Sequence, residues 1–390
     1  MNDILPGGAD AYENLTPYSL MLAGVRNASV PAAVNVALPK IRPDAIFAGI
    51  STALNFARSV ALATGRALRV VTLTEYYDPE PLRAAVAAHL AAGGRAMPPI
   101  AVVPQPLLPH LGVSDEDIWI TTLWNTAHAA SVAADLGVID RSKVVYLIQD
   151  YEPGFAPWSV QHALTRATYH AGFHHVVNSR PLATYLADQE GADADHGLVI
   201  APHLELERLE RAASARVPAD HVRIFFYSRP SKPRNLYELG VATLKHAATR
   251  LADLKIPYRV ISAGEVHPEV TLPGGGVVEN LGITSWDAYF DLLGTLDVGL
   301  SLMYSPHPSH PPLELAVSGA LAVTNDLDGV RQHLHPRANA VPADVASLSD
   351  ALVDAARQAL QDGPAEYCAP VEGALGDSLE TVVAALVDRL

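Results

Sequence analysis

The feature that most constrains the fold is an alternation of short apolar runs with segments of helical length, repeated in two successive series. The first series extends from residues 34–39 to residues 198–201, and the second begins at residues 222–228. Strands that alternate with helices pair in parallel, and the helices cover both faces of the sheet. We therefore predict an α/β protein built from two such series.

The length of the chain divides it in the same way. At 390 residues it exceeds the size at which one hydrophobic core stops growing, so two domains of somewhat less than about 200 residues each are expected. Residues 204–221 are charged, rich in alanine and interrupted by Pro218, and we interpret them as the linker. We place the first domain at residues 1–215 and the second at 216–365, and residues 366–390 form a helix that can pack back onto the first domain.

Charge and cysteine content exclude several classes of function. The formal net charge of -15 disfavours nucleic acid, because phosphates need an excess of Lys and Arg on the binding face. The one cysteine, Cys368, excludes an intrachain disulfide and fits a reducing compartment. No apolar run reaches the roughly 18 residues that a membrane span needs, and the N-terminus lacks a signal-peptide pattern. We expect a cytoplasmic protein, with peripheral contact at the inner face of a membrane left open.

Residues 297–325 join an apolar strand, a loop rich in Pro, His and Ser, a short helix and a second apolar strand. Such a loop lies at the carboxyl end of a strand, which is the edge where open α/β sheets bind ligands. We expect Glu314 in the first turn of the helix, which Pro311 and Pro312 open. It either complements the helix dipole or holds the two hydroxyls of a ribose, and the stretch alone leaves both readings open.

A cluster of cations follows the strand at residues 222–228. Arg229, Lys232 and Arg234 lie within six residues, and Asn235 with Glu238 forms a plausible capping pair for the next helix. Cationic side chains beside the free N–H groups of a helix N-terminus form an anion site, for which a diphosphate is the natural occupant. The alternative is a solvated basic loop. The position at a strand end and two prolines that fix the backbone favour the anion site.

A second polar loop follows the apolar strand that ends near residue 149. Asp150, Tyr151 and Glu152 come directly after it. A carboxylate here can orient or deprotonate a hydroxyl group of a substrate, and we favour Asp150 over Glu152 for that task. The alternative is a residue that caps a helix or braces the loop.

Several segments resemble a known family. The R-x-x-K loop, ENLGITSWDAYFDLLGTLDVGLSLM and P-P-L-E-L-A-x-S-G resemble the nucleotide-sugar half of GT-B fold retaining glycosyltransferases of family 4. YLIQDYEPGFAPWS and SLMYSPHPSHPPLELAVSG are similar to the rhamnosyltransferases of bacterial surface-glycan assembly that use dTDP-L-rhamnose. The resemblance covers most of residues 31–335. It implies two Rossmann-like domains facing each other across a cleft.

The resemblance also implies a donor site. Its residues would be Gly49, Arg229, Lys232, Arg234, Gly282, Ile283, Tyr304, Ser305, His307 and Glu314. Arg229 and Lys232 would bind the diphosphate, Glu314 the ribose, and Gly282 with Ile283 the edge of the base. The family has a further glutamate eight residues before the position of Glu314, where this chain has Pro306. Tyr304, Ser305 and His307 are the candidates to replace that acid at the donor sugar.

On the acceptor side the resemblance implies Asp150, Tyr151, Glu152 and Trp158. Asp150, Arg229 and Lys232 are the expected catalytic residues, with no metal ion or other cofactor. Gly49, in the first turn between strand and helix, would let the backbone approach the donor phosphates closely. Trp124 and Trp158 are each as well explained by core packing as by stacking on a sugar ring.

The function implied is transfer of a deoxyhexose, L-rhamnose first, from a dTDP donor to a saccharide or glycolipid acceptor. Two alternatives stay open: a transferase that uses a UDP- or GDP-sugar, and a nucleotide-sugar binding protein of the same fold without transfer activity. An epimerase of the same fold would share the architecture but not the IQDYEP segment.

Overall fold

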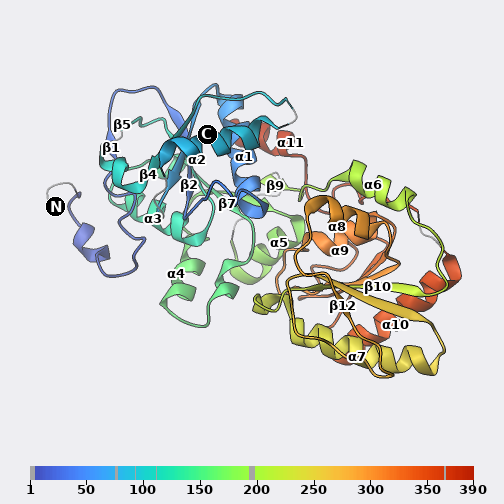
Figure 1. Ribbon diagram of the computed structural model, residues 1–390. Coiled ribbons are helices and arrows are strands. Elements are labelled where there is room, and N and C mark those ends of the chain that lie inside the picture. The colour runs from blue at the N-terminus through green and yellow to red at the C-terminus, as the bar shows by residue number, and fades with distance from the viewer. Residues whose placement is uncertain (1–4, 75–77, 93, 111, 193–197, 364–365) are drawn as a thin grey trace. The chain divides into compact units, whose positions relative to one another are not determined.

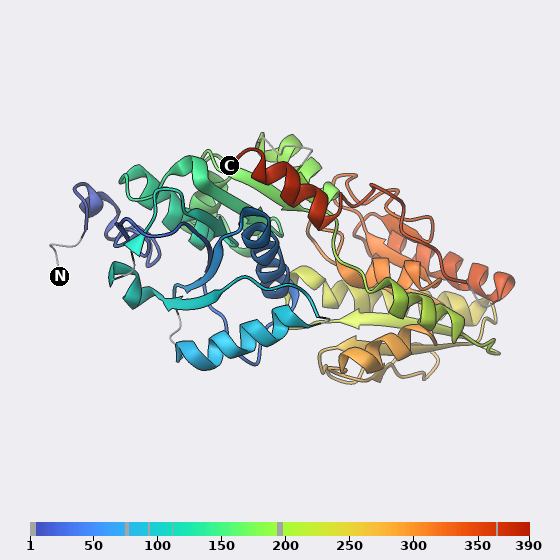
Figure 2. The ribbon, with the colours of Figure 1, turned by 90° about the horizontal axis from the view of Figure 1, so that it is seen from above.

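The computed structural model describes residues 5–74, 78–92, 94–110, 112–192, 198–363 and 366–390. The chain forms two compact units: the first comprises Met1–Ala201 with Gly376–Leu390, and the second comprises Pro202–Leu375. Figures 1 and 2 show the elements of each unit. In the part of the chain that is described, we find no helix with the length and apolar character needed to cross a membrane.

The first unit is built on a parallel sheet with the strand order β4-β3-β2-β6-β7-β8-β9. Its strands are β2 (Ala33–Leu38), β3 (Ala67–Thr72), β4 (Ile100–Pro104), β6 (Ile118–Thr121), β7 (Val144–Ile148), β8 (His174–Asn178) and β9 (Val199–Ile200), and β1 (Arg26–Asn27) pairs separately with β5 (Gly112–Val113). Its helices are α1 (Ala48–Thr64), α2 (Pro79–Ala91), α3 (Trp124–Asp135), α4 (Val160–Thr168), α5 (Arg180–Tyr185) and α11 (Leu379–Val387), with short 3-10 helices at Ala9–Tyr12, Gln105–His110, Arg141–Lys143 and Glu152–Phe155 and a π-helix at Leu186–Glu190.

Both faces of this sheet are buried, as a parallel sheet requires. Successive side chains of a strand point to opposite faces. In β7, Val145 and Leu147 join the core under α1 and α2, whereas Tyr146 and Ile148 join the core under α3 and α5. The prediction of a doubly covered parallel sheet is confirmed.

The second unit is also a parallel sheet, with the order β12-β11-β10-β13-β14-β15. Its strands are β10 (Val222–Ser228), β11 (Tyr258–Gly264), β12 (Glu279–Asn280), β13 (Val298–Leu300), β14 (Leu321–Asn325) and β15 (Ala338–Val341). Its helices are α6 (Leu206–Ser214), α7 (Tyr237–Asp253), α8 (Trp286–Leu293), α9 (His310–Val317) and α10 (Val345–Asp362), with a 3-10 helix at Pro233–Asn235. In Figure 1, α7 and α10 lie on one side of this sheet, and α8 and α9 lie on the other.

The unit boundaries differ from the predicted domain limits. The first unit ends at Ala201, whereas we predicted residue 215, because part of the expected linker forms α6. The buried side of α6 carries Leu209, Ala212 and Ala213, and the helix packs on α8 and α9. At the other end α11 packs beside α1 in the first unit (Figures 1 and 2).

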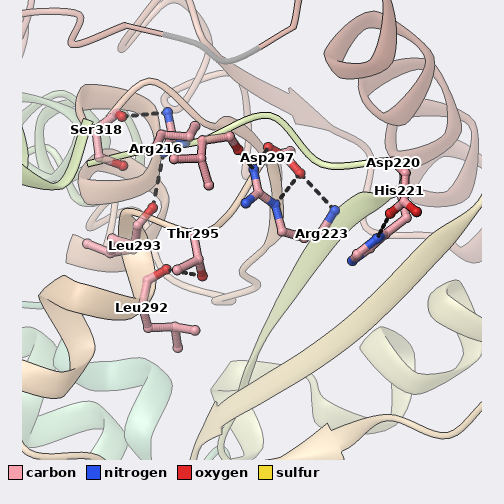
Figure 3. Close-up of polar contacts among 10 residues, drawn as sticks. Arg216, Asp220, His221, Arg223, Leu292, Leu293, Thr295, Asp297 and Ser318 are labelled. Atoms are coloured by element: carbon pink, nitrogen blue, oxygen red, sulfur yellow. Dashed lines mark hydrogen bonds and ion pairs between the residues drawn. The ribbon is translucent and has the colours of Figure 1, made fainter. Parts of the chain in front are cut away.

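Two arginines hold the amino-terminal edge of the second sheet (Figure 3). Arg223 donates from Nε and Nη2 to Asp297 at 2.9 and 2.6 Å. Arg216 is buried and donates to the carbonyl oxygens of Ser318, at 2.8 Å, and Leu293, at 3.1 Å. Burial lowers the pKa of Arg216 to about 10, which leaves the guanidinium charged at neutral pH. The segment after α6 is thereby tied to the ends of α8 and α9.

Gly299 allows α9 to pack closely on the sheet. A Cβ atom at this position in β13 would lie 2.3 Å from Cδ1 and 3.1 Å from Cγ of Leu315. Leu315 is fully buried on α9, so the added atom would have to displace a packed side chain. The missing side chain at Gly299 therefore fixes the position of the helix that carries Glu314.

Gly299→Ala should destabilise the second unit by about 1–3 kcal/mol, because the added methyl group overpacks a closed contact. Gly276→Ala is the matched control, since its nearest new neighbour would be at 3.9 Å. Hydrogen exchange of peptides from β13 and α9 measures the difference. Equal protection in the two variants would contradict this account of the packing.

Candidate functional site

The carboxyl edge of the second sheet is where the chain order reverses. β10 lies between β11, which follows it in sequence, and β13, which begins the other half of the sheet. Ligands of open α/β sheets bind at such a switch point, outside the carboxyl ends of the strands. The loops after β10, β11, β12 and β13 all begin there.

The predicted cation loop follows β10 and contacts an acidic residue that follows β11. Arg229 forms an ion pair with Glu265, with Nε 3.3 Å from Oε1. Ser231 donates its backbone N–H and its hydroxyl to the same carboxylate at 3.0 and 2.8 Å. Burial raises the pKa of Glu265, but the hydrogen bonds from Ser231 and Arg229 outweigh it and hold that pKa below its ordinary value. Lys232 and Arg234 are exposed. The loop thus presents positive charge at the carboxyl edge.

The capping pair predicted for the next helix is wrong. Leu236 is the N-cap of α7, in left-handed backbone geometry with φ 50°. Asn235 is buried and donates from Nδ2 to the carbonyl oxygen of Leu302 at 3.1 Å. Asn235 therefore joins the cation loop to the segment after β13.

Glu314 lies in the second turn of α9, not in the first turn as we expected, because the helix begins at His310. Its side chain is buried, and Oε2 accepts a hydrogen bond of 2.7 Å from the Tyr289 hydroxyl. Burial raises the pKa of Glu314 to about 7. The nearby charge of Glu205 adds to this rise, and the hydrogen bond from Tyr289 opposes it. A buried carboxylate beyond the first turn does not serve the helix dipole. The ribose-binding role stays a prediction.

The segment after β13 exposes one of its three candidate residues. Tyr304 is 58% exposed, and its N–H donates to the carbonyl oxygen of Arg234 at 2.6 Å. Ser305 and His307 are buried, and Ser305 Oγ accepts the N–H of His307 at 3.2 Å. The buried Arg331 donates from Nη2 to the His307 carbonyl oxygen at 2.6 Å. Burial, with nearby positive groups adding, lowers the pKa of His307 well below its ordinary value, so the imidazole is neutral.

The predicted base-edge residues follow β12. Gly282 has a positive φ of 63°, and a Cβ there would lie 2.9 Å from Cγ2 of Val266. Its carbonyl oxygen accepts the Gly264 N–H at 2.9 Å, and its own N–H donates to Asn280 Oδ1 at 2.8 Å. Ile283 is 80% exposed. The backbone is therefore fixed beside the end of β11, with an apolar side chain held out into solvent.

In the first unit, Gly49 lies inside the first turn of α1 and not in the turn before it. A Cβ at Gly49 would lie 3.2 Å from Oε1 of Gln149. Since Gln149 directly precedes Asp150, the missing side chain lets the start of α1 approach the polar loop after β7.

Asp150 and Tyr151 lie half-buried in that loop. Asp150 Oδ1 accepts the Tyr151 N–H at 2.8 Å. The Tyr151 hydroxyl donates to Glu190 at 2.5 Å, and Arg166 donates to the other oxygen of Glu190 at 2.7 Å. The Tyr151 ring also packs edge-on against Tyr185 at 5.1 Å. Tyr151 thus anchors the loop, and its hydroxyl is directed at Glu190.

Glu152 is buried, which does not fit the acceptor contact expected for it. Its Oε2 accepts the N–H of Trp124 at the start of α3 at 2.5 Å, and Oε1 accepts the Tyr146 hydroxyl at 3.2 Å. Its own N–H donates to the Tyr169 hydroxyl at 3.2 Å. Burial raises the pKa of Glu152 to about 8 against the two hydrogen bonds it accepts. The loop-bracing alternative describes Glu152.

The two candidate tryptophans differ in solvent exposure. Trp124 is buried and packs edge-on against Tyr18 at 5.6 Å, so it belongs to the core. Trp158 is 90% exposed and stacks on His162 with 5.3 Å between ring centroids and 11° between planes. Only Trp158 of this pair offers a free ring face.

Sequence reasoning missed Glu265, Tyr289 and Arg331. Glu265 follows the apolar strand β11 directly, as Arg229 follows β10, so its position was a usable signal. Tyr289 and Arg331 carry no local signal, because each meets its partner only through tertiary packing.

Comparison with known proteins agrees with this architecture. The N-terminal domain of WsaF matches residues 33–179, and the C-terminal domain of WsaF matches residues 222–353. Over 210 residues, 54% of this chain, the sequence is 30% identical to the O-antigen biosynthesis protein RfbC of Myxococcus xanthus, of which it spans 16%.

Solved structures share the fold at low identity. A glycosyltransferase from Rickettsia africae ESF-5 has a TM-score of 0.54 at 12% identity, with 92% of this chain and 97% of that chain covered. Anabaena Alr3699/HepE has a TM-score of 0.57 at 13% identity, with 92% and 95% covered.

The two parallel units thus have the GT-B fold of solved glycosyltransferases, as the resemblance implied. More particularly, the chain belongs to the WsaF family, since the two domain matches together account for most of its length.

Glu152 should make the stability of the first unit depend on pH. Its pKa is about 8 when folded against an ordinary value of 4.5, so the folded state holds a proton that the unfolded state releases. Stability from this group is fully present below pH 4.5 and is lost as the pH rises towards 8, by an amount on the order of a few kcal/mol. Glu152→Gln should flatten this slope.

The measurement is urea unfolding followed by fluorescence in a Trp286→Phe background, where the three remaining tryptophans lie in the first unit. Glu13→Gln, which removes an exposed carboxylate of the same unit, is the control. An unchanged slope in Glu152→Gln would show that Glu152 is ionised in the folded protein.

Proposed function

We propose that this chain transfers a deoxyhexose, L-rhamnose, from dTDP-L-rhamnose to a growing cell-surface saccharide, with retention of anomeric configuration. The observation that carries the proposal is the cation loop at the carboxyl edge of the second sheet, together with the buried Glu314 at the same edge. The RfbC relative is described as an O-antigen biosynthesis protein, which supports a surface-glycan product.

On the donor side, Arg229 and Lys232 would bind the diphosphate and stabilise the charge that develops as it leaves, without a divalent cation. Glu314 would accept the ribose hydroxyls, and the fixed backbone at Gly282 would meet the base edge. Tyr304 is the exposed candidate for contact with the donor sugar.

On the acceptor side, Asp150 would orient or deprotonate the hydroxyl that attacks. Glu152 braces its loop, and the free ring face of Trp158 is suited to stacking on a sugar. The acceptor would be a saccharide or a glycolipid, and peripheral contact with a membrane would bring the protein to the latter.

A UDP-sugar is the second candidate donor. Anabaena Alr3699/HepE, which shares the fold, is described in complex with UDP and with UDP-glucose. Backbone contacts to a base edge distinguish thymine from uracil poorly, since the two differ by one methyl group.

Calorimetric titration with dTDP, UDP and GDP tests the donor site. We expect dTDP to bind most tightly and Arg229→Ala to weaken binding by about tenfold or more, because it removes a charge-assisted hydrogen bond. Arg259→Ala removes an exposed arginine that pairs with Glu279 in the same unit, and it should leave the affinity unchanged. UDP binding more tightly than dTDP would select the second donor, and no binding of any nucleotide would refute the proposal.

Asp150→Asn should reduce turnover of dTDP-L-rhamnose in the presence of a glycan acceptor by about a hundredfold or more, because it removes the general base. Binding of dTDP should be retained. Asp115→Asn, an exposed acid of the same unit, is the control. Full activity in Asp150→Asn would remove this residue from the acceptor site.

A further inference from the structure

The cation loop already holds an anion that belongs to the chain. The Glu265 carboxylate accepts hydrogen bonds from the Ser231 N–H, the Ser231 hydroxyl and Arg229 Nε, at 3.0, 2.8 and 3.3 Å. A guanidinium, a backbone N–H and a hydroxyl are the donors that phosphate oxygens use in protein sites. The carboxylate therefore occupies the place where a bound phosphate would make its contacts.

The fold places Glu265 there by close approach of two strands. β10 and β11 pair in register up to Ser228 and Gly264, and the Glu265 N–H donates to the Ser228 carbonyl oxygen at 2.9 Å. Gly264 has a positive φ of 131°, and a Cβ there would lie 2.4 Å from the Ser228 oxygen. Only glycine allows this geometry, so the residue that follows it is delivered to the cation loop.

We propose that Glu265 is an internal counter-anion, which occupies the anion site of residues 229–232 until a diphosphate displaces it. It thereby sets the affinity of the site and favours release of the diphosphate product. A diphosphate carries more negative charge than one carboxylate and has more acceptor oxygens, so it competes successfully. The identification of the diphosphate as part of a nucleotide rests on the proposed function. The anion site itself does not depend on that function.

The ion pair of Glu265 with Arg229 is partly open to solvent. The Glu265 side chain is 19% exposed and that of Arg229 is 35% exposed, so the pair lies at the surface of the site. Since the binding-competent form is the one in which Glu265 has moved away, the apparent dissociation constant equals the intrinsic one divided by the fraction of time that the carboxylate is away. A residue that merely positions Arg229 and stays on it in the complex would have the opposite effect when changed.

The test is calorimetric titration of the full chain with inorganic pyrophosphate and with dTDP, on wild type, Glu265→Gln and Glu265→Ala. We expect both variants to bind pyrophosphate and dTDP more tightly, by roughly tenfold, because the competing charge is gone. Asp350→Asn is the control. It removes the same charge from the same unit, at an exposed pair with Arg250, and should match wild type. Thermal unfolding of each variant verifies the fold.

Equal or weaker pyrophosphate binding in Glu265→Gln, or no pyrophosphate binding to any of the proteins, would overturn the counter-anion proposal. If the variants bind pyrophosphate more tightly but no nucleoside diphosphate binds, the counter-anion stands and the proposed donor is wrong. If nucleotides bind and the variants do not bind more tightly, the donor site stands and the counter-anion fails.

Discussion

The parallel ladder of β10 with β11 and β13 is the constraint on which the second unit depends. It aligns Ser228 with Gly264 and Phe226 with Leu300, so the residues that follow three separate strands begin at one edge. Parallel strands present their ends in this way because every crossover returns the chain to the same side. Three parts of the chain that are distant in sequence meet there: the cation loop, its acidic partner and the segment before α9.

Two glutamates of this edge show how environment separates equal side chains. Glu265 accepts hydrogen bonds from a serine and an arginine, which favour its ionised form over the effect of burial. Glu314 has one hydroxyl partner, from Tyr289, and burial raises its pKa to about 7. One carboxylate thus balances local positive charge, while the other is about half protonated at neutral pH.

Much of the fold could be predicted from the sequence, because apolar runs of strand length and helical segments alternate clearly. Details that depend on packing could not. The stretch containing α6 has the composition of a linker, yet Leu209 gives it a buried face once α8 and α9 are present. Asn235 has the sequence position of a helix cap, but its side-chain amide instead donates a hydrogen bond to the buried carbonyl oxygen of Leu302. Glu314 falls in the second turn of α9 because the helix begins at His310, before the proline pair that we expected to open it.

The two acids of the IQDYEP loop also differ in their surroundings. Glu152 accepts the N–H of Trp124 at the start of α3, so it fastens the end of β7 to the next helix of the sheet. Asp150 accepts the N–H of Tyr151, and it lies half-buried at the strand end. A carboxylate that braces a loop cannot also turn to a substrate without breaking the brace. Burial therefore ties Glu152 to the brace, and Asp150 is the acid of this loop that we propose to contact the acceptor hydroxyl.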